Sequence, residues 1–379
     1  MGKAVSLGAI ARARGGDLLA THPTTPAQRK VLRSIADCRT EALGGHRDRC
    51  DRCHYEHTFW NSCRDRHCPG CGAEASQSWL AKRRDEVLDA AYFHVVFTIP
   101  ESLNALALHA PQLLYTILLR AAGQALLDVA GSKLRARIGV LTVLHTWGQT
   151  LVFHPHVHCV VPGGGFSLDG RRWVRVPTGT FLLHHKVLSR RFRTLVRNAI
   201  TEAYDAGTLI LPPHIVHDRT ALDLLLARAS KTDWHSYVKP PFGGPEQVLA
   251  YLAAYTHRVA ISNRRILAFD NDRVTFAYRD SKHGNAQKSM ELPATEFLRR
   301  FLTHVVPPRF TRIRYYGFLS NRDRTANIAK ARALIASTRK LRPRHPAPNP
   351  RLCPQCHQGT MRIRARLDPQ RPRTWFDSS

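Results

Sequence analysis

Clustering of the cysteines constrains this chain more than any other feature. Six of the nine cysteines fall between Cys38 and Cys71, in a stretch rich in His and Arg and poor in aliphatic residues. Such a stretch cannot build an apolar core of its own, so it needs a metal ion or covalent cross-links. Disulfide frameworks are typical of small secreted chains, whereas this chain has 379 residues and no recognisable secretory segment. The clustering therefore predicts a small zinc-binding module.

Two C-x-x-C pairs in this stretch are the expected zinc ligands. Cys50 with Cys53 and Cys68 with Cys71 each offer two thiolates at a spacing typical of tetrahedral sites, so we expect all four to bind one structural zinc. Two thiols and two imidazoles nearby either form a second zinc site or pack around the first: Cys38, His46, Cys63 and His67. A late pair, Cys353 and Cys356, resembles half of a zinc ribbon without evident partners.

The charge balance indicates a polyanionic partner. Lys and Arg number 57 against 28 Asp and Glu, which gives a formal net charge of +29 at pH 7. Hydrophobic residues make up 43% of the chain, as in folded proteins, so the charge does not come from a disordered basic tail alone. Cationic side chains that neutralise phosphates release counterions, which favours nucleic acid. The best apolar run, Leu113–Leu119, is too short to span a bilayer, so no membrane partner is expected.

Composition divides the chain into four segments. Residues 1–25 have weak periodicity and Gly, Thr and Pro breakers, which predicts a loosely ordered lead-in. Residues 26–89 contain the zinc-binding module, whose arginines suit docking to DNA. Residues 90–320 alternate strand and helix patterns and predict an α+β domain, including strands at 92–99, 138–149 and 151–161. Residues 321–379 form a basic tail with the late cysteine pair.

One predicted strand carries a pair of histidines. Strand periodicity places His156 and His158 on one face, whereas Val157 and Cys159 point the other way into a core. Two imidazoles on a rigid strand can hold a divalent ion whose remaining positions stay open for a substrate. Such a pair also occurs without a metal, as hydrogen-bonded strand residues. The pattern is therefore a candidate metal site.

A third ligand is needed to complete that site. Gln149, near the end of the preceding strand, has an amide oxygen that suits a hard cation. His154 competes with it, and a carboxylate from elsewhere in the chain remains open. His145 is interpreted as a strand residue.

Two tyrosines share one face of a predicted helix. Tyr251 and Tyr255 are spaced i, i+4, which is more often a core pattern than a catalytic one. Their neighbours are polar and basic, and three arginines are candidate DNA contacts: Arg258, Arg264 and Arg265. A face of this kind suits a phosphate better than burial. A nucleophilic phenol needs help from a base or a cation, because its ordinary pKa is about 10.

Together these motifs resemble a known family. The chain combines a cysteine module, a Trp-Gly-Gln sequence before His-Pro-His-Val-His, and a Tyr-x-x-x-Tyr-Thr-His-Arg helix. In this order they resemble the two-tyrosine HUH transposases of bacterial rolling-circle insertion sequences, the insertion sequence 91 family, which carry an N-terminal zinc-binding domain. The resemblance covers roughly residues 26–320. It implies an HUH-type nuclease domain with a central antiparallel sheet flanked by helices.

The resemblance also implies a mechanism. His156, His158 and Gln149 would hold Mg²⁺ or Mn²⁺, and Tyr251 or Tyr255 would attack single-stranded DNA at element ends and target, leaving a 5′-phosphotyrosine. No nucleotide cofactor is expected, since the chain has no phosphate-binding G-x-x-x-x-G-K-[ST] loop. Such a protein would work in the bacterial cytoplasm, associated with the nucleoid.

Two other interpretations remain open at this point. In the first, the chain is a non-catalytic, zinc-dependent DNA-binding regulator whose histidines and tyrosines are structural. In the second, it is a replication initiator or relaxase of the same superfamily. A covalent adduct between protein and DNA separates the first of these from the transposase.

Overall fold

The computed structural model describes residues 5–176, 183–216, 218–231, 234–239, 247–248, 251, 259–280, 283–335 and 351–370. Its centre is a seven-stranded sheet in the order β7-β6-β4-β5-β3-β8, with β12 also paired to β4, and every pairing is antiparallel. The strands are β3 (Tyr92–Thr98), β4 (Ala136–Trp147), β5 (Phe153–Pro162), β6 (Gly164–Ser167), β7 (Trp173–Arg175), β8 (Ser236–Lys239) and β12 (Ile313–Gly317). The predicted α+β class with a central antiparallel sheet is confirmed.

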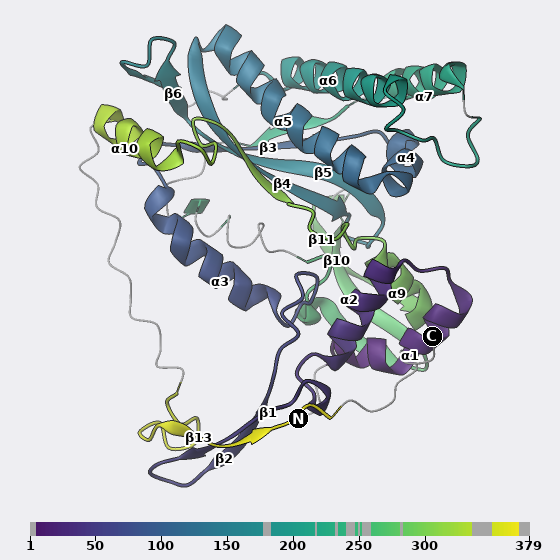
Figure 1. The fold of residues 1–379 in the computed structure, drawn as a ribbon, viewed down its shortest axis with the longest axis vertical. Coiled ribbons are helices and arrows are strands. Elements are labelled where there is room, and N and C mark those ends of the chain that lie inside the picture. Colours follow the sequence, from purple (N-terminus) through teal and green to yellow (C-terminus); the bar gives the residue numbers. More distant parts are fainter. Residues whose placement is uncertain are drawn as a thin grey trace.

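Helices cover one face of this sheet. They are α4 (Asn104–His109), α5 (Pro111–Lys133), α6 (His185–Asp205) and α7 (Arg219–Lys231), and α5 crosses the long strands in Figure 1. Val157 and Cys159 of β5 are fully buried in the core beneath these helices, as strand alternation predicts. Among the described residues, α5 alone is long and apolar enough to cross a membrane, and 67% of its most apolar window is buried. Such burial is typical of a core helix.

The other face of the sheet is covered differently. Its apolar core includes Tyr92, Val143 and Val160 and is completed by α3 (Gly72–Arg83) and α10 (Arg324–Ile335). In Figure 1, α3 runs between the cysteine-rich segment and the central sheet. Tyr251 packs against this core too. Helices therefore pack on both faces, and the second face also carries the polar residues described below.

A second apolar core joins the N-terminal helices to residues 260–305. It is built from α1 (Leu7–Thr21), α2 (Pro26–Asp37), β9 (Ile266–Asp270), β10 (Arg273–Asp280), β11 (Ala286–Pro293) and α9 (Ala294–Leu302). The predicted lead-in is wrong here, because Leu7, Ile10 and Leu18 are completely buried. The helix α1 is short of large apolar residues, so its periodicity is weak, and its burial depends on α2 and α9.

A small three-stranded sheet connects residues that are far apart in the sequence. Its order is β13-β1-β2, with β1 (Gly45–Cys50), β2 (Glu56–Trp60) and β13 (Met361–Leu367), at the bottom of Figure 1. The register pairs Cys50 with Met361 and Gly45 with Leu367. Residues 361–367 are therefore part of the cysteine-rich module and not of a separate tail. Four short 3₁₀ helices complete the description: Glu41–Leu43, Arg84–Glu86, Glu101–Leu103 and Asn263–Arg265.

Candidate metal centres and tyrosine site

Eight cysteines gather into two clusters of four. In each cluster the sulfur atoms all lie within 4.8 Å of one another, and none of the eight forms a disulfide. The first cluster contains Cys38, Cys63, Cys68 and Cys71, and the second contains Cys50, Cys53, Cys353 and Cys356. The expected grouping of Cys50 and Cys53 with Cys68 and Cys71 is wrong. Pairing of β1 with β13 carries the late cysteine pair to Cys50, and this contact is invisible in the sequence.

The first cluster has the dimensions of a tetrahedral metal site. A zinc ion with Zn–S bonds of about 2.3 Å separates its sulfurs by about 3.8 Å. The Sγ atom of Cys71 lies 3.6 Å from that of Cys38 and 3.7 Å from that of Cys63. Hydrogen bonding from the Cys63 thiol, with further thiols nearby, lowers the pKa of Cys38. A thiolate at this position suits a metal ion, since metals bind the deprotonated form.

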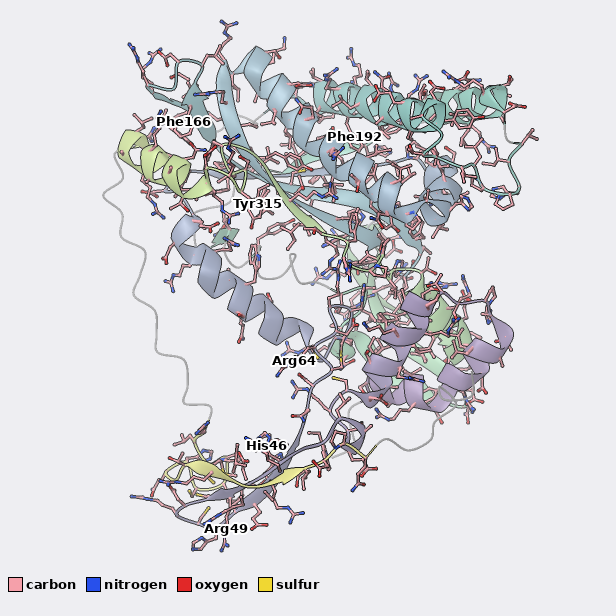
Figure 2. All side chains as sticks on the ribbon, viewed as in Figure 1. His46, Arg49, Arg64, Phe166, Phe192 and Tyr315 are labelled. Atoms are coloured by element: carbon pink, nitrogen blue, oxygen red, sulfur yellow. The ribbon has the colours of Figure 1, made fainter. Side chains whose placement is uncertain are left out.

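The two candidate imidazoles lie outside this cluster. Burial lowers the pKa of His67, whose Nε2 accepts a hydrogen bond from the Val306 amide at 3.3 Å. Its Nδ1 is therefore the donor to Asp65 Oδ1, at 3.0 Å, and neither nitrogen faces a metal. His46 lies on β1, where its ring stacks on Phe59 with centroids 5.4 Å apart. Figure 2 labels it on the small sheet. The second site expected from Cys38, His46, Cys63 and His67 is thus replaced by a site of four cysteines.

Three histidines meet on the face of the central sheet that lies opposite α5. His145 of β4 pairs directly with His156 of β5, and His158 lies two residues further along β5 on the same face. One nitrogen from each lies within 4.8 Å of the others. His145 and His158 are buried, whereas His156 is half-buried. Such a set can hold a divalent ion.

Neighbouring groups orient these rings. The Nδ1 of His156 donates to the backbone carbonyl of His154 at 2.7 Å, which leaves Nε2 for a metal. The ring of His145 stacks on Trp147, with centroids 4.5 Å apart. His154 thus contributes its carbonyl group to the site. Sequence reasoning treated His145 as a plain strand residue, although the short connection between β4 and β5 could have suggested its pairing with His156.

Gln149 lies in the turn between β4 and β5, and its side chain is exposed. Its backbone carbonyl accepts a hydrogen bond from Arg265 Nη2 at 2.5 Å, and Arg265 Nε donates to the carbonyl of Ala277 at 2.8 Å. Arg265 therefore ties the turn to β10. Arg264 is exposed, and Arg258 lies outside the described residues.

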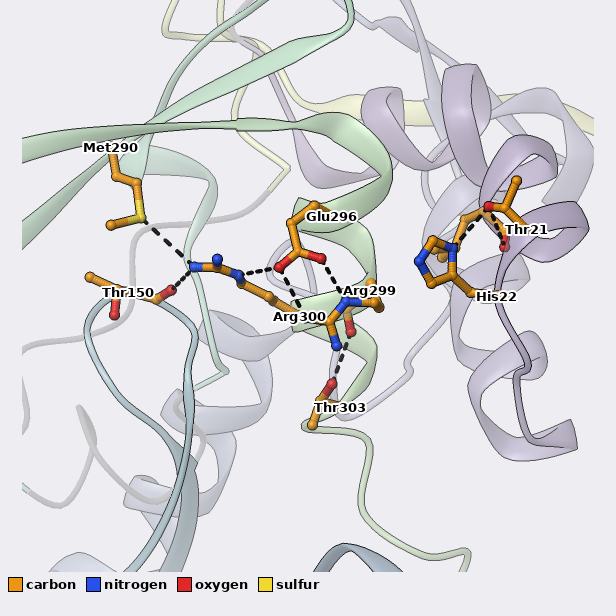
Figure 3. A network of polar contacts seen from close by, with 9 residues as sticks. Thr21, His22, Thr150, Met290, Glu296, Arg299, Arg300 and Thr303 are labelled. Atoms are coloured by element: carbon orange, nitrogen blue, oxygen red, sulfur yellow. Dashed lines mark hydrogen bonds and ion pairs between the residues drawn. The ribbon is translucent and has the colours of Figure 1, made fainter. Parts of the chain in front are cut away.

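A second arginine holds the same turn from α9. Arg300 donates through Nε to Glu296 at 2.6 Å and through Nη1 to the carbonyl of Thr150 at 3.3 Å (Figure 3). Glu296 also accepts from Arg299, and these guanidinium groups lower its pKa to about 2. The turn that follows β4 is therefore fixed by two independent cationic side chains.

Tyr251 reaches the histidine cluster. Its hydroxyl lies 2.6 Å from His94 Nε2 and 3.2 Å from His158 Nδ1, and those two nitrogens are 2.8 Å apart. His94 is only 2% exposed and belongs to β3, on the face that carries the other histidines. One proton arrangement satisfies all three groups: the hydroxyl donates to His94, and His158 Nδ1 donates to the hydroxyl oxygen. Tyr255 lies outside the described residues.

Sequence reasoning missed His94. Its signal was present, because Tyr92 and His94 alternate with the buried Phe93 and Val95 and must share the opposite face. The sequence does not show which strand pairs with β3, and therefore which side chains lie beside His94. Pairing of β3 with β5 makes His94 a diagonal neighbour of His158.

An aromatic side chain flanked by cations lies on the same face of the sheet. Tyr315 of β12, labelled in Figure 2, pairs with Leu141 of β4. The guanidinium carbons of Arg324 and Arg83 lie 4.5 Å and 5.9 Å from its ring centroid. Cation–π pairing of this kind holds the guanidinium groups against the sheet.

Comparison with known proteins places the chain among transposases. Residues 139–326 match a family profile described as "Putative transposase", and residues 10–99 match one described as "Transposase zinc-binding domain". "Putative transposase y4qJ" of Sinorhizobium fredii is 46% identical over 352 residues, covering 88% of each chain. The "Transposase for insertion sequence element IS801" of Pseudomonas savastanoi pv. phaseolicola is 29% identical, covering 77% of this chain and 70% of its own. No solved structure matches.

The first thiol cluster lies within the zinc-binding match, and the histidines of β4 and β5 lie within the transposase match. The N-terminal cysteines thus provide a structural zinc site, and DNA is the partner that a transposase handles. The S. fredii relative aligns with 88% of this chain, so the zinc-binding and transposase regions occur together in that protein too. The chain belongs to the insertion sequence 91 family of transposases, with an N-terminal zinc-binding domain.

Proposed function

We propose that this transposase nicks and rejoins single-stranded DNA through a 5′-phosphotyrosine on Tyr251. The observation that carries the proposal is the position of the Tyr251 hydroxyl, 2.6 Å from His94 Nε2 and 3.2 Å from His158 Nδ1. A phenol beside an imidazole base and a candidate metal centre has the two aids that a nucleophilic tyrosine needs. A purely structural tyrosine would not require them.

The proposed reaction is a transesterification. The Tyr251 oxygen attacks the phosphorus while its proton passes to His94 Nε2, which accepts it at 2.6 Å. The bond between phosphorus and the 3′ oxygen breaks, and that oxygen takes up a proton from water to become a free 3′-OH. The phosphotyrosine link keeps the energy of the original phosphodiester, so attack by another 3′-OH joins strands without a nucleotide cofactor.

A divalent ion fits between the three histidines. The donor set of His145, His156 and His158 is entirely imidazole, which suits a first-row transition ion better than Mg²⁺, an ion that prefers oxygen ligands. We therefore favour Mn²⁺ over Mg²⁺, with His145 in the place expected for Gln149. When bound, the ion would polarise the phosphate oxygens.

Two further roles are proposed from the sequence. Tyr255, four residues after Tyr251 in the sequence, is the second nucleophile, which allows a second cleavage while the first covalent link persists. Arg258 and the exposed Arg264 would contact phosphates, whereas Arg265 positions the turn at Gln149. We expect the protein to act in the cytoplasm on nucleoid DNA.

The test is adduct formation. The full chain is incubated with Mn²⁺ and labelled single-stranded oligonucleotides that carry the ends of its own element, and the products are separated under denaturing conditions. We expect a labelled protein band, which Tyr251→Phe abolishes and Tyr255→Phe leaves after the first cleavage. Absence of an adduct with the unaltered protein, while the oligonucleotides still bind, would favour the non-catalytic regulator. An adduct that persists in Tyr251→Phe would move the nucleophile elsewhere.

A further inference from the structure

We propose that Cys50, Cys53, Cys353 and Cys356 hold a second structural zinc ion, which fastens the C-terminal strand β13 to the N-terminal module. The cysteines at 353 and 356 lie outside both matched family regions, 10–99 and 139–326. The site would join parts of the chain that are about 300 residues apart. It stands on its own geometry, whether or not Tyr251 is a nucleophile.

The distances between sulfurs are those of a metal site. Cys50 Sγ lies 3.8 Å from Cys356 Sγ, and Cys53 Sγ lies 3.7 Å from Cys353 Sγ. These values match the separation of about 3.8 Å around a tetrahedral ion with Zn–S bonds of about 2.3 Å. A disulfide would bring two sulfurs to about 2.0 Å. Each C-x-x-C pair thus faces the other across a space of the size that one ion fills.

Backbone amides point at the sulfurs from both pairs. The Arg52 amide donates to Cys50 Sγ at 3.4 Å, and the Gln355 and Gly359 amides donate to Cys353 Sγ and Cys356 Sγ at 3.4 Å and 3.3 Å. Such bonds stabilise negative charge on sulfur, because the donors complement the thiolate. The early and late pairs therefore share one local design, although they come from opposite ends of the chain.

A glycine makes the approach of the two pairs possible. A Cβ atom at Gly359 would lie 2.3 Å from Cys50 Sγ, so any other residue would push the late pair away from β1. Two polar contacts align the same loops: the Thr360 amide donates to Asp51 Oδ1 at 2.8 Å, and Arg52 Nη1 donates to Gln358 at 2.7 Å. The glycine and these two contacts thus hold the loops where the four thiols can meet.

Apart from strand pairing with β1 and a few polar contacts, little apolar packing holds this segment in place. The apolar cluster around the site consists of Cys50, Cys353 and Met361, with Tyr55 and Cys356 partly buried at its edge. Side chains from Arg362 to Arg366 of β13 are exposed. So small a core cannot stabilise a module without a metal ion or cross-link. Four thiolates without nitrogen or oxygen ligands select a soft ion, and zinc is the non-redox choice for a purely structural tetrahedral site.

The experiment compares the metal content of matched cysteine variants. The full chain is purified under reducing conditions, and its zinc is measured by mass spectrometry after removal of loosely bound ions. We expect Cys353→Ser/Cys356→Ser to lose one equivalent of zinc per chain relative to the unaltered protein. Cys159→Ala, which removes the one cysteine outside both clusters, should lose none. An unchanged zinc content in the double variant overturns the proposal, as does iron in place of zinc.

A second measurement needs no variant. Alkylation of the native protein, mapped by peptide mass spectrometry, should modify Cys353 and Cys356 only after a zinc chelator is added. Hydrogen exchange at Met361–Leu367 should accelerate at the same point, because the strand would lose its anchor. Rapid alkylation before chelation, or a disulfide between the pairs in reduced protein, contradicts the proposal even if the variants fail to fold.

Discussion

The hydroxyl of Tyr251 touches the imidazoles of His94 and His158, and its environment makes His94 the base in the proposed reaction. Replacing His94 with Gln keeps a side chain of similar size but removes the base. We expect adduct formation to fall by about 10²-fold or more, since general-base catalysis contributes factors of about 10² to 10⁴. His154→Ala is the comparison, because it keeps the backbone carbonyl that accepts from His156 and should reduce adduct formation much less.

The third metal ligand can be tested in the same way. His145→Ala removes one of three clustered nitrogens, and we expect Mn²⁺ affinity to weaken by about 10-fold or more. Gln149→Ala should change that affinity by less than about twofold, since its exposed side chain lies in the turn. Isothermal titration with Mn²⁺ measures both. A larger loss of Mn²⁺ affinity in the Gln149 variant would identify Gln149, and not His145, as the third ligand.

At the scale of elements, α5 contains two glycines with opposite roles. A Cβ at Gly123 would lie 2.6 Å from the ring of Tyr316 on β12, whereas one at Gly131 would meet nothing within 4 Å. We expect Gly123→Ala to destabilise the protein by about 1–3 kcal/mol through overpacking, and Gly131→Ala to stabilise it by up to about 1 kcal/mol through helix propensity. Urea unfolding of the two variants provides the comparison. Equal effects would contradict close packing of α5 on β12.

The contact between α9 and the turn after β4 predicts a pH effect. Arginine partners hold the pKa of Glu296 at about 2, below its ordinary 4.5, so the ionised side chain stabilises the fold above pH 4.5. This contribution is lost as the pH falls toward 2. We expect Glu296→Gln to cost on the order of 1 kcal/mol at pH 7, and the difference from the unaltered protein to shrink below pH 4.5. Thermal unfolding across pH measures it. Glu291→Gln, at a more exposed ion pair with Arg273, should change stability less.

At the scale of the whole molecule, the net charge of +29 predicts strongly salt-dependent binding to single-stranded DNA. Each neutralised phosphate contributes about 0.7 to the slope of log affinity against log salt. With three or more such contacts, a threefold rise in salt should weaken binding by about 10-fold or more. Fluorescence anisotropy with a labelled oligonucleotide measures the slope. Arg264→Gln should lower the slope by about one contact, and an unchanged slope would remove Arg264 from the DNA interface.

Local patterns were sufficient for much of the fold. The alternation in residues 151–161 predicted which side chains of β5 face the helices, and β-branched runs bounded by turns located β3 and β4. The weak pattern of residues 7–21 failed, since burial of α1 depends on α2 and α9, and α9 is more than 250 residues away. Short-range periodicity carries no information about such partners.

For the candidate site, the sequence by itself determined the kinds of groups present: paired thiols, paired strand histidines, spaced tyrosines and an excess of positive charge. Tertiary structure alone decided how they combine. Pairing of β4 with β5 brought His145 to His156, pairing of β3 with β5 brought His94 to His158, and pairing of β13 with β1 divided the cysteines into two clusters. The physical reason is that ligand spacing along a chain constrains only neighbours, whereas a metal site or a proton relay is defined by distances across strands.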